Sequence, residues 1–235
     1  MYGLLPLLLR RQGAGAPSGA LAFSGFQMRT IAYVDGFNLY YGSLKNSPHK
    51  WLDLCEYFRQ TLPAGYVLEK VKYFTARVSA LPNDPHAPAR QEIYLRALRA
   101  HSGQQFQAIE GRFSVKNVRA PLAAPPHRTV EIIKSEEKGS DVNLAVELVN
   151  DAWLDSFECA AIVSNDADLE RALKIAKQYR KKRIILYTPG APIRRPLGQL
   201  TRWSHKQIDV LPGVLAKCQL PVTLMDGAIS KPAAW

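Results

Sequence analysis

The chain alternates between short apolar runs and longer amphipathic segments. Runs made almost wholly of apolar residues are typical of strands buried on both faces of a sheet, and they occur at 29–35, 159–164 and 183–188. Shorter or alternating apolar stretches predict further strands at 66–78, 106–115, 129–135 and 207–212. Apolar residues at helical spacing predict helices between the strands, at 51–62, 89–101, 141–154 and 167–182.

This order of elements predicts an α/β fold with a mainly parallel central sheet and helices on both faces. One domain would span residues 28–218, and residues 219–235, which carry little pattern, are expected to form a C-terminal tail. Residues 1–27 contain no acid and are rich in Leu, Gly and Ala, so we expect a disordered or spurious N-terminal extension. A signal peptide is disfavoured there because Arg10 and Arg11 follow the apolar run, whereas a transit peptide would share the acid-free composition.

Acidic residues follow the predicted strands at the places where such folds bind ligands. In open α/β sheets, ligands occupy the crevice beyond the carboxyl ends of the strands. Asp35 ends the first strand, Asp141 opens a helix, and Asp166 and Asp168 follow the strand 159–164. Carboxylates crowded at one edge repel one another unless a cation lies among them. Hard oxygen ligands of this kind suit Mg²⁺ or Mn²⁺.

Each of these polar residues also has a simpler explanation. Asp is favoured at the start of a helix, which accounts for Asp141 taken alone and accounts for Asp166 or Asp168 as well as metal binding does. Asn38 can cap the first helix or point into the site. Lys138 can pair with a neighbouring Glu on the surface or contact a phosphate group near the acids.

Composition narrows the choice of partner. The 235 residues include 31 Lys and Arg against 20 Asp and Glu, and the net charge of +11 favours a polyanionic partner such as nucleic acid. The excess is concentrated at 177–183 and 194–206, which could follow an RNA backbone. The longest apolar runs have about six residues, against the roughly 20 that cross a membrane. Three Cys without a CxxC pair predict neither a disulfide framework nor a zinc site, and they suit a reducing cytoplasm.

Three stretches, in order along the chain, carry a family likeness. YVDGFNLYYG, EEKGSDVNLAVELVNDAW and VSNDADLERAL resemble the NYN domain of the PIN-like nuclease superfamily, in its LabA-like branch. The resemblance extends over about 28–211 and implies a Rossmann-like (PIN-like) sandwich with a divalent-metal ribonuclease site. A further acid early in the chain is common in such sites, but neither Glu69 nor Glu92 matches a motif.

The resemblance also implies roles for individual residues. Asp35, Asp141 and Asp166 would be ligands of Mg²⁺ or Mn²⁺, and Asp168 would be a fourth acid or a water-mediated ligand. Substrate-contacting positions of the family are matched by Asn38, Lys138 and Ser164.

We therefore expect a metal-dependent endoribonuclease that hydrolyses RNA phosphodiesters. The alternative is a non-catalytic RNA-binding or regulatory module, which keeps the basic surface without the chemistry. A third alternative, hydroxylation of a pyridine ring, has been assigned to some similar proteins. The sequence offers it little support, because there is no GxGxxG turn and the five His are scattered. A homodimer is compatible with the sequence.

Overall fold

A computed structural model describes residues 27–80, 82–126, 128–190 and 198–235. The predicted N-terminal extension, residues 1–27, lies outside the described residues except for Gln27, as do residues 194–197 of the second basic stretch. None of the helices in the described ranges is long and apolar enough to span a membrane.

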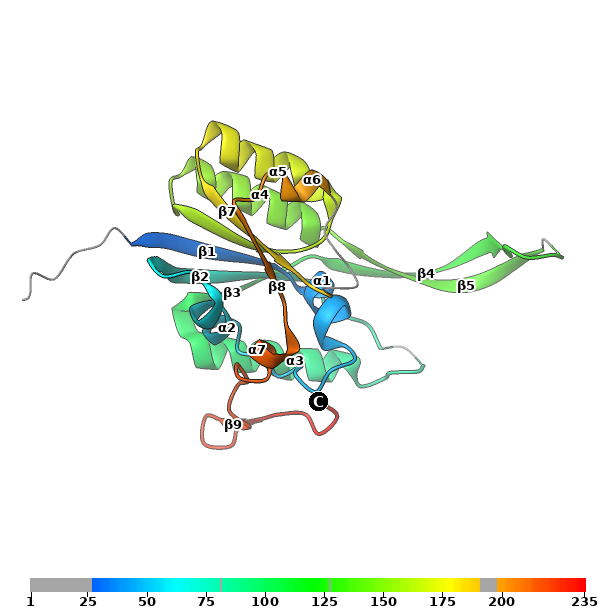
Figure 1. The fold of residues 1–235 in the computed structure, drawn as a ribbon. Coiled ribbons are helices and arrows are strands. Elements are labelled where there is room, and N and C mark those ends of the chain that lie inside the picture. The colour runs from blue at the N-terminus through cyan, green and yellow to red at the C-terminus, as the bar shows by residue number, and fades with distance from the viewer. Residues whose placement is uncertain (1–26, 81, 127, 191–197) are drawn as a thin grey trace, which may run out of the picture.

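A six-stranded parallel sheet forms the centre of the molecule, as the sequence predicts (Figure 1). Its strand order is β3-β2-β1-β6-β7-β8. The order reverses between β1 and β6, so the crevice beyond the carboxyl ends of these two neighbours is the expected ligand position for this topology. The strands are β1 (Met28–Asp35), β2 (Tyr66–Thr75), β3 (Phe106–Glu110), β6 (Cys159–Val163), β7 (Arg183–Thr188) and β8 (Lys206–Asp209).

Helices cover both faces of this sheet and complete the α/β sandwich (Figure 1). One face is covered by α4 (Ser140–Trp153), α5 (Glu170–Lys174) and α6 (Gly198–Thr201). The other face is covered by α2 (Leu54–Thr61), α3 (Ala87–Ser102) and α7 (Pro212–Leu215). Short helix α1 (Gly36–Leu39) follows β1 directly, and helical turns extend several of these elements, at Tyr40–Leu44, Gly103–Gln105, Ala167–Leu169 and Ile175–Tyr179.

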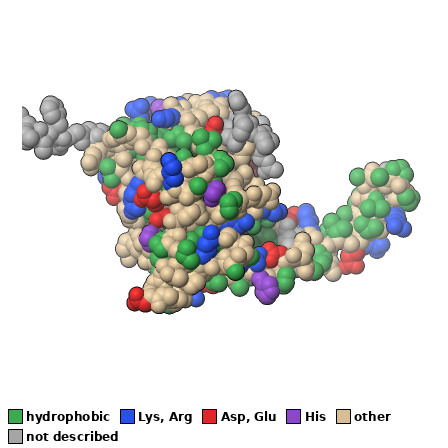
Figure 2. Space-filling view, turned by 60° about the horizontal axis from the view of Figure 1, so that its bottom comes forward, with side chains coloured by type: hydrophobic (Ala, Val, Ile, Leu, Met, Phe, Trp, Pro, Cys, Tyr) green, Lys and Arg blue, Asp and Glu red, His purple; other side chains and the backbone are tan. Residues whose placement is uncertain are grey.

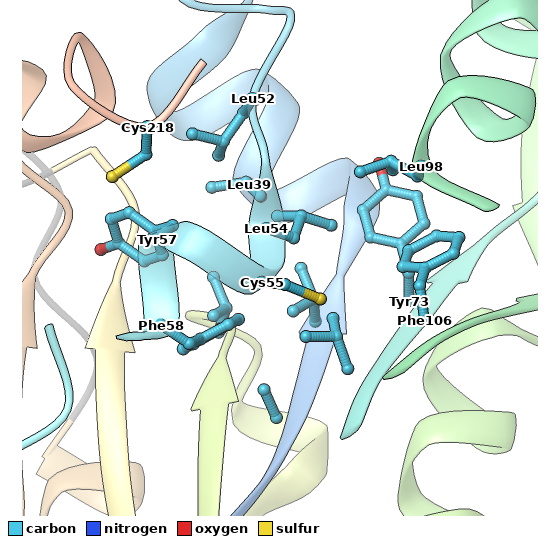
Figure 3. Packing of buried hydrophobic residues seen from close by; sticks show 14 of the residues in the cluster. Leu39, Leu52, Leu54, Cys55, Tyr57, Phe58, Tyr73, Leu98, Phe106 and Cys218 are labelled. Carbon is cyan, nitrogen blue, oxygen red and sulfur yellow. The ribbon is translucent and has the colours of Figure 1, made fainter. Parts of the chain in front are cut away.

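The two layers of core follow from the alternation of side chains along the central strands. Ala32 and Val34 of β1 pack under α2 and α3, whereas Ile31 and Tyr33 point to the α4 side. Strands β6 and β7 alternate in the same way, which explains why these runs are apolar throughout. Figure 3 shows the first layer, in which side chains of α2 such as Phe58 lie over the strands.

A buried polar network fastens α4 to the sheet. Lys72 of β2 donates hydrogen bonds of 2.6 Å to the carboxylates of Glu147 and Asp151, and the Tyr33 hydroxyl donates to Asp151 at 2.6 Å. Lys72 and Asp151 are each 7% exposed. Burial lowers the pKa of Lys72, but its hydrogen bonds to the two carboxylates outweigh burial and leave the pKa raised. The ammonium group therefore stays charged inside the protein.

A two-stranded arm projects from the body at the end of the sheet where α1 lies (Figure 1). It consists of β4 (Arg112–Pro121) paired antiparallel with β5 (Thr129–Lys138). The sequence pattern predicted one strand at 106–115 and a short strand at 129–135, and both bounds were wrong. Gly111 separates β3 from β4 and lies so close to Lys138 that a Cβ there would be 2.7 Å from the Lys138 carbonyl oxygen. The chain leaves the sheet at this point, and only glycine fits here because a side chain would clash with Lys138.

The segment after residue 218, expected to be a tail, packs onto the body. Leu220 is 3% exposed and Ile229, in the small hairpin of β9 (Thr223–Leu224) and β10 (Ile229–Ser230), is 5% exposed. The Trp51 indole donates a 2.8 Å hydrogen bond to the Pro221 carbonyl, and the Trp235 ring packs edge-on against it at 6.3 Å. These contacts close the core on the α2 and α3 side.

Candidate functional site

Asp35 lies at the carboxyl end of β1 with 3% of its surface exposed. One carboxylate oxygen accepts the Asn38 backbone N–H at 2.9 Å, so Asp35 is the N-cap of α1. The other oxygen accepts the Asn38 side-chain amide at 2.8 Å and the Ser164 hydroxyl at 3.1 Å. A carboxylate offers about four acceptor positions, so one position stays available to a further partner.

The loop after β6 meets Asp35 in the crevice where the strand order reverses. Buried Ser164 donates to Asp35 and accepts the Asp166 backbone N–H at 3.0 Å. Asp166 accepts the Asp168 backbone N–H at 2.9 Å, so it caps the following helical turn while facing the crevice. Asp168 is exposed at the rim. The capping and site interpretations of Asp166 are therefore compatible.

Asp141 approaches the same crevice from the first turn of α4. The helix begins one residue earlier than predicted, at Ser140, and Gly139 occupies the cap position with a φ of 97°. The Glu137 carboxylate accepts the Ser140 backbone N–H at 2.8 Å and takes over the capping role. Asp141 is thus not needed as a cap, and its carboxylate is left half-buried beside the other acids.

Burial and the neighbouring carboxylates both affect the pKa of Asp141. Burial and then the charges of Asp35, Asp166, Glu137 and Asp168 raise its pKa to about 7. Burial also raises the pKa of Asp35, although hydrogen bonds from Asn38 and Ser164 counteract it. A site that withholds solvent from several carboxylates in this way favours a proton or a cation among them.

The site accounts for most of the candidate residues and adds one. Asn38 is not the helix cap; its side chain binds Asp35, and its side-chain oxygen lies 3.4 Å from the Asn165 backbone N–H, which donates to it. Lys138 is exposed on the arm, where it pairs with Glu136 at 3.9 Å. Glu137 was missed by sequence reasoning. Its proximity to Asp141 depends on the pairing of β5 with β4. The only signal in the sequence is that Glu137 and Asp141 share the motif EEKGSD.

In the described part of the chain, two residues next to the acids in sequence carry a buried oxygen atom without a partner. Among the described residues, the buried Ser140 hydroxyl and the buried Asn165 side-chain carbonyl accept or donate no hydrogen bond. Buried polar atoms of this kind usually indicate an ordered water or ion. The two oxygen atoms, like the carboxylates of Asp35, Asp141 and Asp166, are the kind of donor that suits Mg²⁺ or Mn²⁺. Within the same residues, however, no three acidic, His or Cys side chains are gathered as closely as the ligands of one ion.

A pocket of about 410 Å³ opens beside the acids. Gly36, which follows Asp35, lines it, and burial together with the charge of Asp35 raises the pKa of Tyr73 in its wall. Lys45 and Lys50 contribute positive charge, whereas Arg90 pairs with Asp84, which also lines the pocket. Six further aromatic side chains line the pocket: Phe37, Tyr40, Tyr41, Tyr94, Phe113 and Trp235.

The basic stretch 177–183 lies at the opposite edge of the sheet. Arg183 begins β7, whereas Asp35 ends β1, and the strands are parallel. Arg180 donates to the carbonyls of Ala152 and Trp153, and the buried Lys182 pairs with Asp155. Arg180 and Lys182 bind other groups of the protein, so they do not form a basic path for RNA towards the acids.

Comparison with known proteins agrees with this architecture. The NYN domain family matches residues 29–197. A curated relative, 6-hydroxy-3-succinoylpyridine 3-monooxygenase HspA of Pseudomonas putida (strain DSM 28022 / S16), is 31% identical over 88% of this chain and 75% of its own length. The crystal structure of VPA0982, a protein of unknown function from Vibrio parahaemolyticus RIMD 2210633, shares the fold with a TM-score of 0.51 at 15% identity, over 80% of this chain and 96% of that one. On the extent of the family match, the chain belongs to the NYN domain family.

Proposed function

We propose that this protein hydrolyses RNA phosphodiesters with the help of Mg²⁺ or Mn²⁺ bound at the carboxylates beyond β1 and β6. The observation that carries the proposal is the convergence of Asp35, Asp141 and Asp166 on this crevice, where burial and the charges of the neighbouring carboxylates raise the pKa of Asp141. A protein gains nothing from such repulsion unless a cation relieves it. The motif resemblance further suggests the LabA-like branch of the superfamily, and three free cysteines without a CxxC pair suit a reducing cytoplasm.

The residues of the site divide the work. Asp35, Asp141 and Asp166 would hold the ion, and Asn38 and Ser164 would keep the Asp35 carboxylate in position through the hydrogen bonds that they donate. When bound, the ion would lower the pKa of a water and neutralise charge that develops on the phosphate. Asp168, exposed at the rim, would accept the proton released by that water.

Cleavage of single-stranded RNA in Mn²⁺ tests the proposal. We expect Asp166→Asn to lower the rate by about a hundredfold or more, since loss of a transition-state interaction commonly costs that much. Asp226→Asn is the matched control, because this exposed residue lies in the C-terminal hairpin with a φ of 52° that Asn tolerates. If wild type cleaves no faster than Asp166→Asn, the protein is not a nuclease. Failure to bind millimolar Mg²⁺ or Mn²⁺ would instead favour a non-catalytic RNA-binding module.

A second candidate function is conversion of a small heteroaromatic compound. It is favoured by the aromatic residues of the pocket beside the acids and by the name of the relative from Pseudomonas putida, a monooxygenase of a succinoylpyridine. The rings of Phe37 and Phe113, whose centroids are 6.1 Å apart, contact each other and could pack against a planar ligand near Lys45.

Titration with 6-hydroxy-3-succinoylpyridine tests this second candidate. Binding should be saturable, and Phe37→Ala should weaken it, whereas Tyr179→Ala, which removes an exposed ring outside the pocket, should not. Yellow colour of the purified protein would indicate a flavin and would further favour this function. Absence of binding at millimolar ligand would remove it.

A further inference from the structure

The arm has two chemically different faces. Its strands pair without a bulge from Arg112↔Lys138 to Pro121↔Thr129, and side chains of paired residues point to the same face of a two-stranded ribbon. One face begins with Phe113, whose ring lies 6.1 Å from that of Phe37 and turns this face towards the body. The opposite face is turned away from Phe37. We call it the basic face of the arm, and its cations are Arg112, Lys116, Lys134 and Lys138.

Positive charges on the basic face lie directly opposite one another. Arg112 pairs with Lys138 across the strands, and Lys116 pairs with Lys134. Like charges in directly opposed positions destabilise a sheet. Among the described residues of this face Glu136 is the one acid, so four cations against one acid leave a net charge of +3. Lys134 and Lys138 both pair with Glu136, and their charges lower its pKa.

The other face carries no such imbalance near its centre. Arg119 is paired across the strands with Glu131, so its charge is matched. At the far end of the arm the space-filling view shows many hydrophobic side chains with Lys or Arg beside them (Figure 2). An isolated two-stranded hairpin is at best marginally stable in water, which makes an uncompensated set of cations on this one costly. An anion lying along the basic face would relieve this repulsion.

The geometry of the basic face selects a linear polyanion. The two opposed pairs are four residues apart on each strand, which corresponds to about 13 Å at roughly 3.3 Å per residue. The ribbon is two strands wide, about 5 Å between strands, so it presents a narrow line of charge and not a broad surface. Lys138 precedes Asp141 by only three residues, which brings one end of this line to the acids of the site.

We propose that the basic face of the arm binds the sugar-phosphate backbone of a single-stranded nucleic acid, with Arg112, Lys116 and Lys134 joining Lys138 as phosphate contacts. This inference rests on the proposed RNA hydrolysis for the identity of the strand, but it concerns binding alone. Contacts to phosphates carry no sequence information, so the arm would bind RNA with little base preference and with strong dependence on salt.

Binding of a fluorescent 20-nucleotide RNA, measured by anisotropy in EDTA, tests the inference without cleavage. Lys116→Glu should weaken binding about fivefold or more at 0.1 M salt, and the slope of log affinity against log salt should become shallower by about 0.7 or more per lost contact. Arg119→Glu is the matched control, because it makes the same change of charge three residues along the same strand but on the other face. We expect it to change affinity less than about twofold.

Lys116→Gln and Lys134→Glu guard against a folding artefact, since each should shift the salt slope in the same direction. Equal weakening by Lys116→Glu and Arg119→Glu would overturn the inference, because the effect would then be one of total charge. The inference would also be overturned if Lys116→Glu kept the RNA affinity of wild type. The same holds if Lys116→Glu lost binding to anionic vesicles while its RNA affinity stayed unchanged.

The outcomes separate this inference from the proposed hydrolysis. A wild-type protein that binds RNA through the basic face but does not cleave it in Mn²⁺ would contradict the hydrolysis and leave the arm's role standing. A protein that cleaves RNA, with Lys116→Glu equal to wild type in affinity, would contradict the arm's role alone.

Discussion

Asp141 lies in the first turn of α4, where burial and neighbouring carboxylates raise its pKa to about 7. Near neutral pH a proton would therefore compete with any cation that binds these oxygen atoms. Without a cation, the folded protein holds a proton that the unfolded chain, with an ordinary Asp pKa of 3.8, releases much earlier. Stability of the metal-free protein is thus linked to pH through this residue.

The sign of that linkage is a first prediction. Between about pH 4 and 7 the folded state binds the proton at Asp141 and the unfolded state does not, so the free energy of unfolding decreases as pH rises through this window. Asp141→Asn removes the contribution, and its stability should fall less steeply with pH than that of wild type. Urea unfolding in EDTA at several pH values measures both slopes. Parallel slopes would contradict the raised pKa.

Gly36 provides a second prediction at this scale, because the start of α1 leaves no room for a side chain. A Cβ at Gly36 would lie 2.6 Å from the Tyr73 ring and 2.8 Å from the Phe74 carbonyl oxygen. Gly36→Ala should therefore lower the free energy of unfolding by about 1 to 3 kcal/mol, as overpacking does. Gly213→Ala is the control: nothing lies within 4 Å of its added Cβ, so denaturant unfolding should show little change.

Sequence reasoning could place the acids because each lies at a boundary that the hydrophobic pattern marks. Asp35 and Asp166 follow apolar strands, and parallel strands bring their ends to one edge. It could not assign the cap of α1, because Asp35 and Asn38 are equally good caps and only the backbone decides between them. Glu137 was out of reach for another reason: its position is set by β4, which lies more than ten residues away.

The elements that carry the acids are fixed by contacts remote from them. Helix α4 holds Asp141 at its start, and its middle is tied to the sheet through Lys72, Glu147 and Asp151. Removing one partner of a buried ion pair leaves the other charge without compensation, which costs more than the pair contributes. The site therefore depends on a network with which it shares no atom.

Substitution of Lys72 makes this a prediction about α4. Lys72→Met should lower the free energy of unfolding by roughly 3 kcal/mol or more, since Asp151 stays buried with only the Tyr33 hydroxyl as partner. Lys70→Met is the control on the same strand, because Lys70 forms no ion pair with any described residue. Denaturant unfolding measures both. Replacing Asp151 by Leu in the Lys72→Met background should recover part of the loss.

The strand 106–115 shows where pattern alone fails at the scale of elements. Alternation continues from β3 into β4, so the sequence reads as one strand, but the chain leaves the sheet at Gly111. The exit depends on a close approach of Gly111 to Lys138 and Ser140, which are remote along the chain. The arm was missed for a related reason. Its two strands pair only with each other, and neither face of the pair is uniformly apolar, so the hydrophobic pattern does not mark them.

At the scale of the whole molecule, the sequence predicts the kind of sheet but not the order of its strands. Parallel strands and two helical layers follow from the apolar runs, but the reversal between β1 and β6 does not. The segment after residue 218 was equally hidden, because short stretches with isolated apolar residues carry no periodicity. Leu220 and Ile229 are nevertheless as buried as residues of the main core.

The contribution of that segment to the whole fold is a further prediction. Leu220→Ala should lower the free energy of unfolding by about 2 to 4 kcal/mol, as for other buried Leu residues. Val222→Ala changes a side chain that is 68% exposed two residues later, and it should stay within about 0.5 kcal/mol of wild type. Thermal or urea unfolding compares the two. Equal effects would mean that the segment is not part of the cooperative unit.

The pairing of β1 with β6 also sets the order in which the molecule can be built. Thr30 of β1 pairs with Cys159 of β6, 129 residues later in the chain. Synthesis of that length takes roughly 6 to 26 s at about 5 to 20 residues per second. During that interval β1 can join β2, but its other edge, apolar and unpaired, is open to association with other chains. Asp35 is likewise alone until Asp141 and Asp166 emerge from the ribosome. Until β6 is made, a nascent chain therefore lacks the assembled acids and exposes an edge of β1 to aggregation.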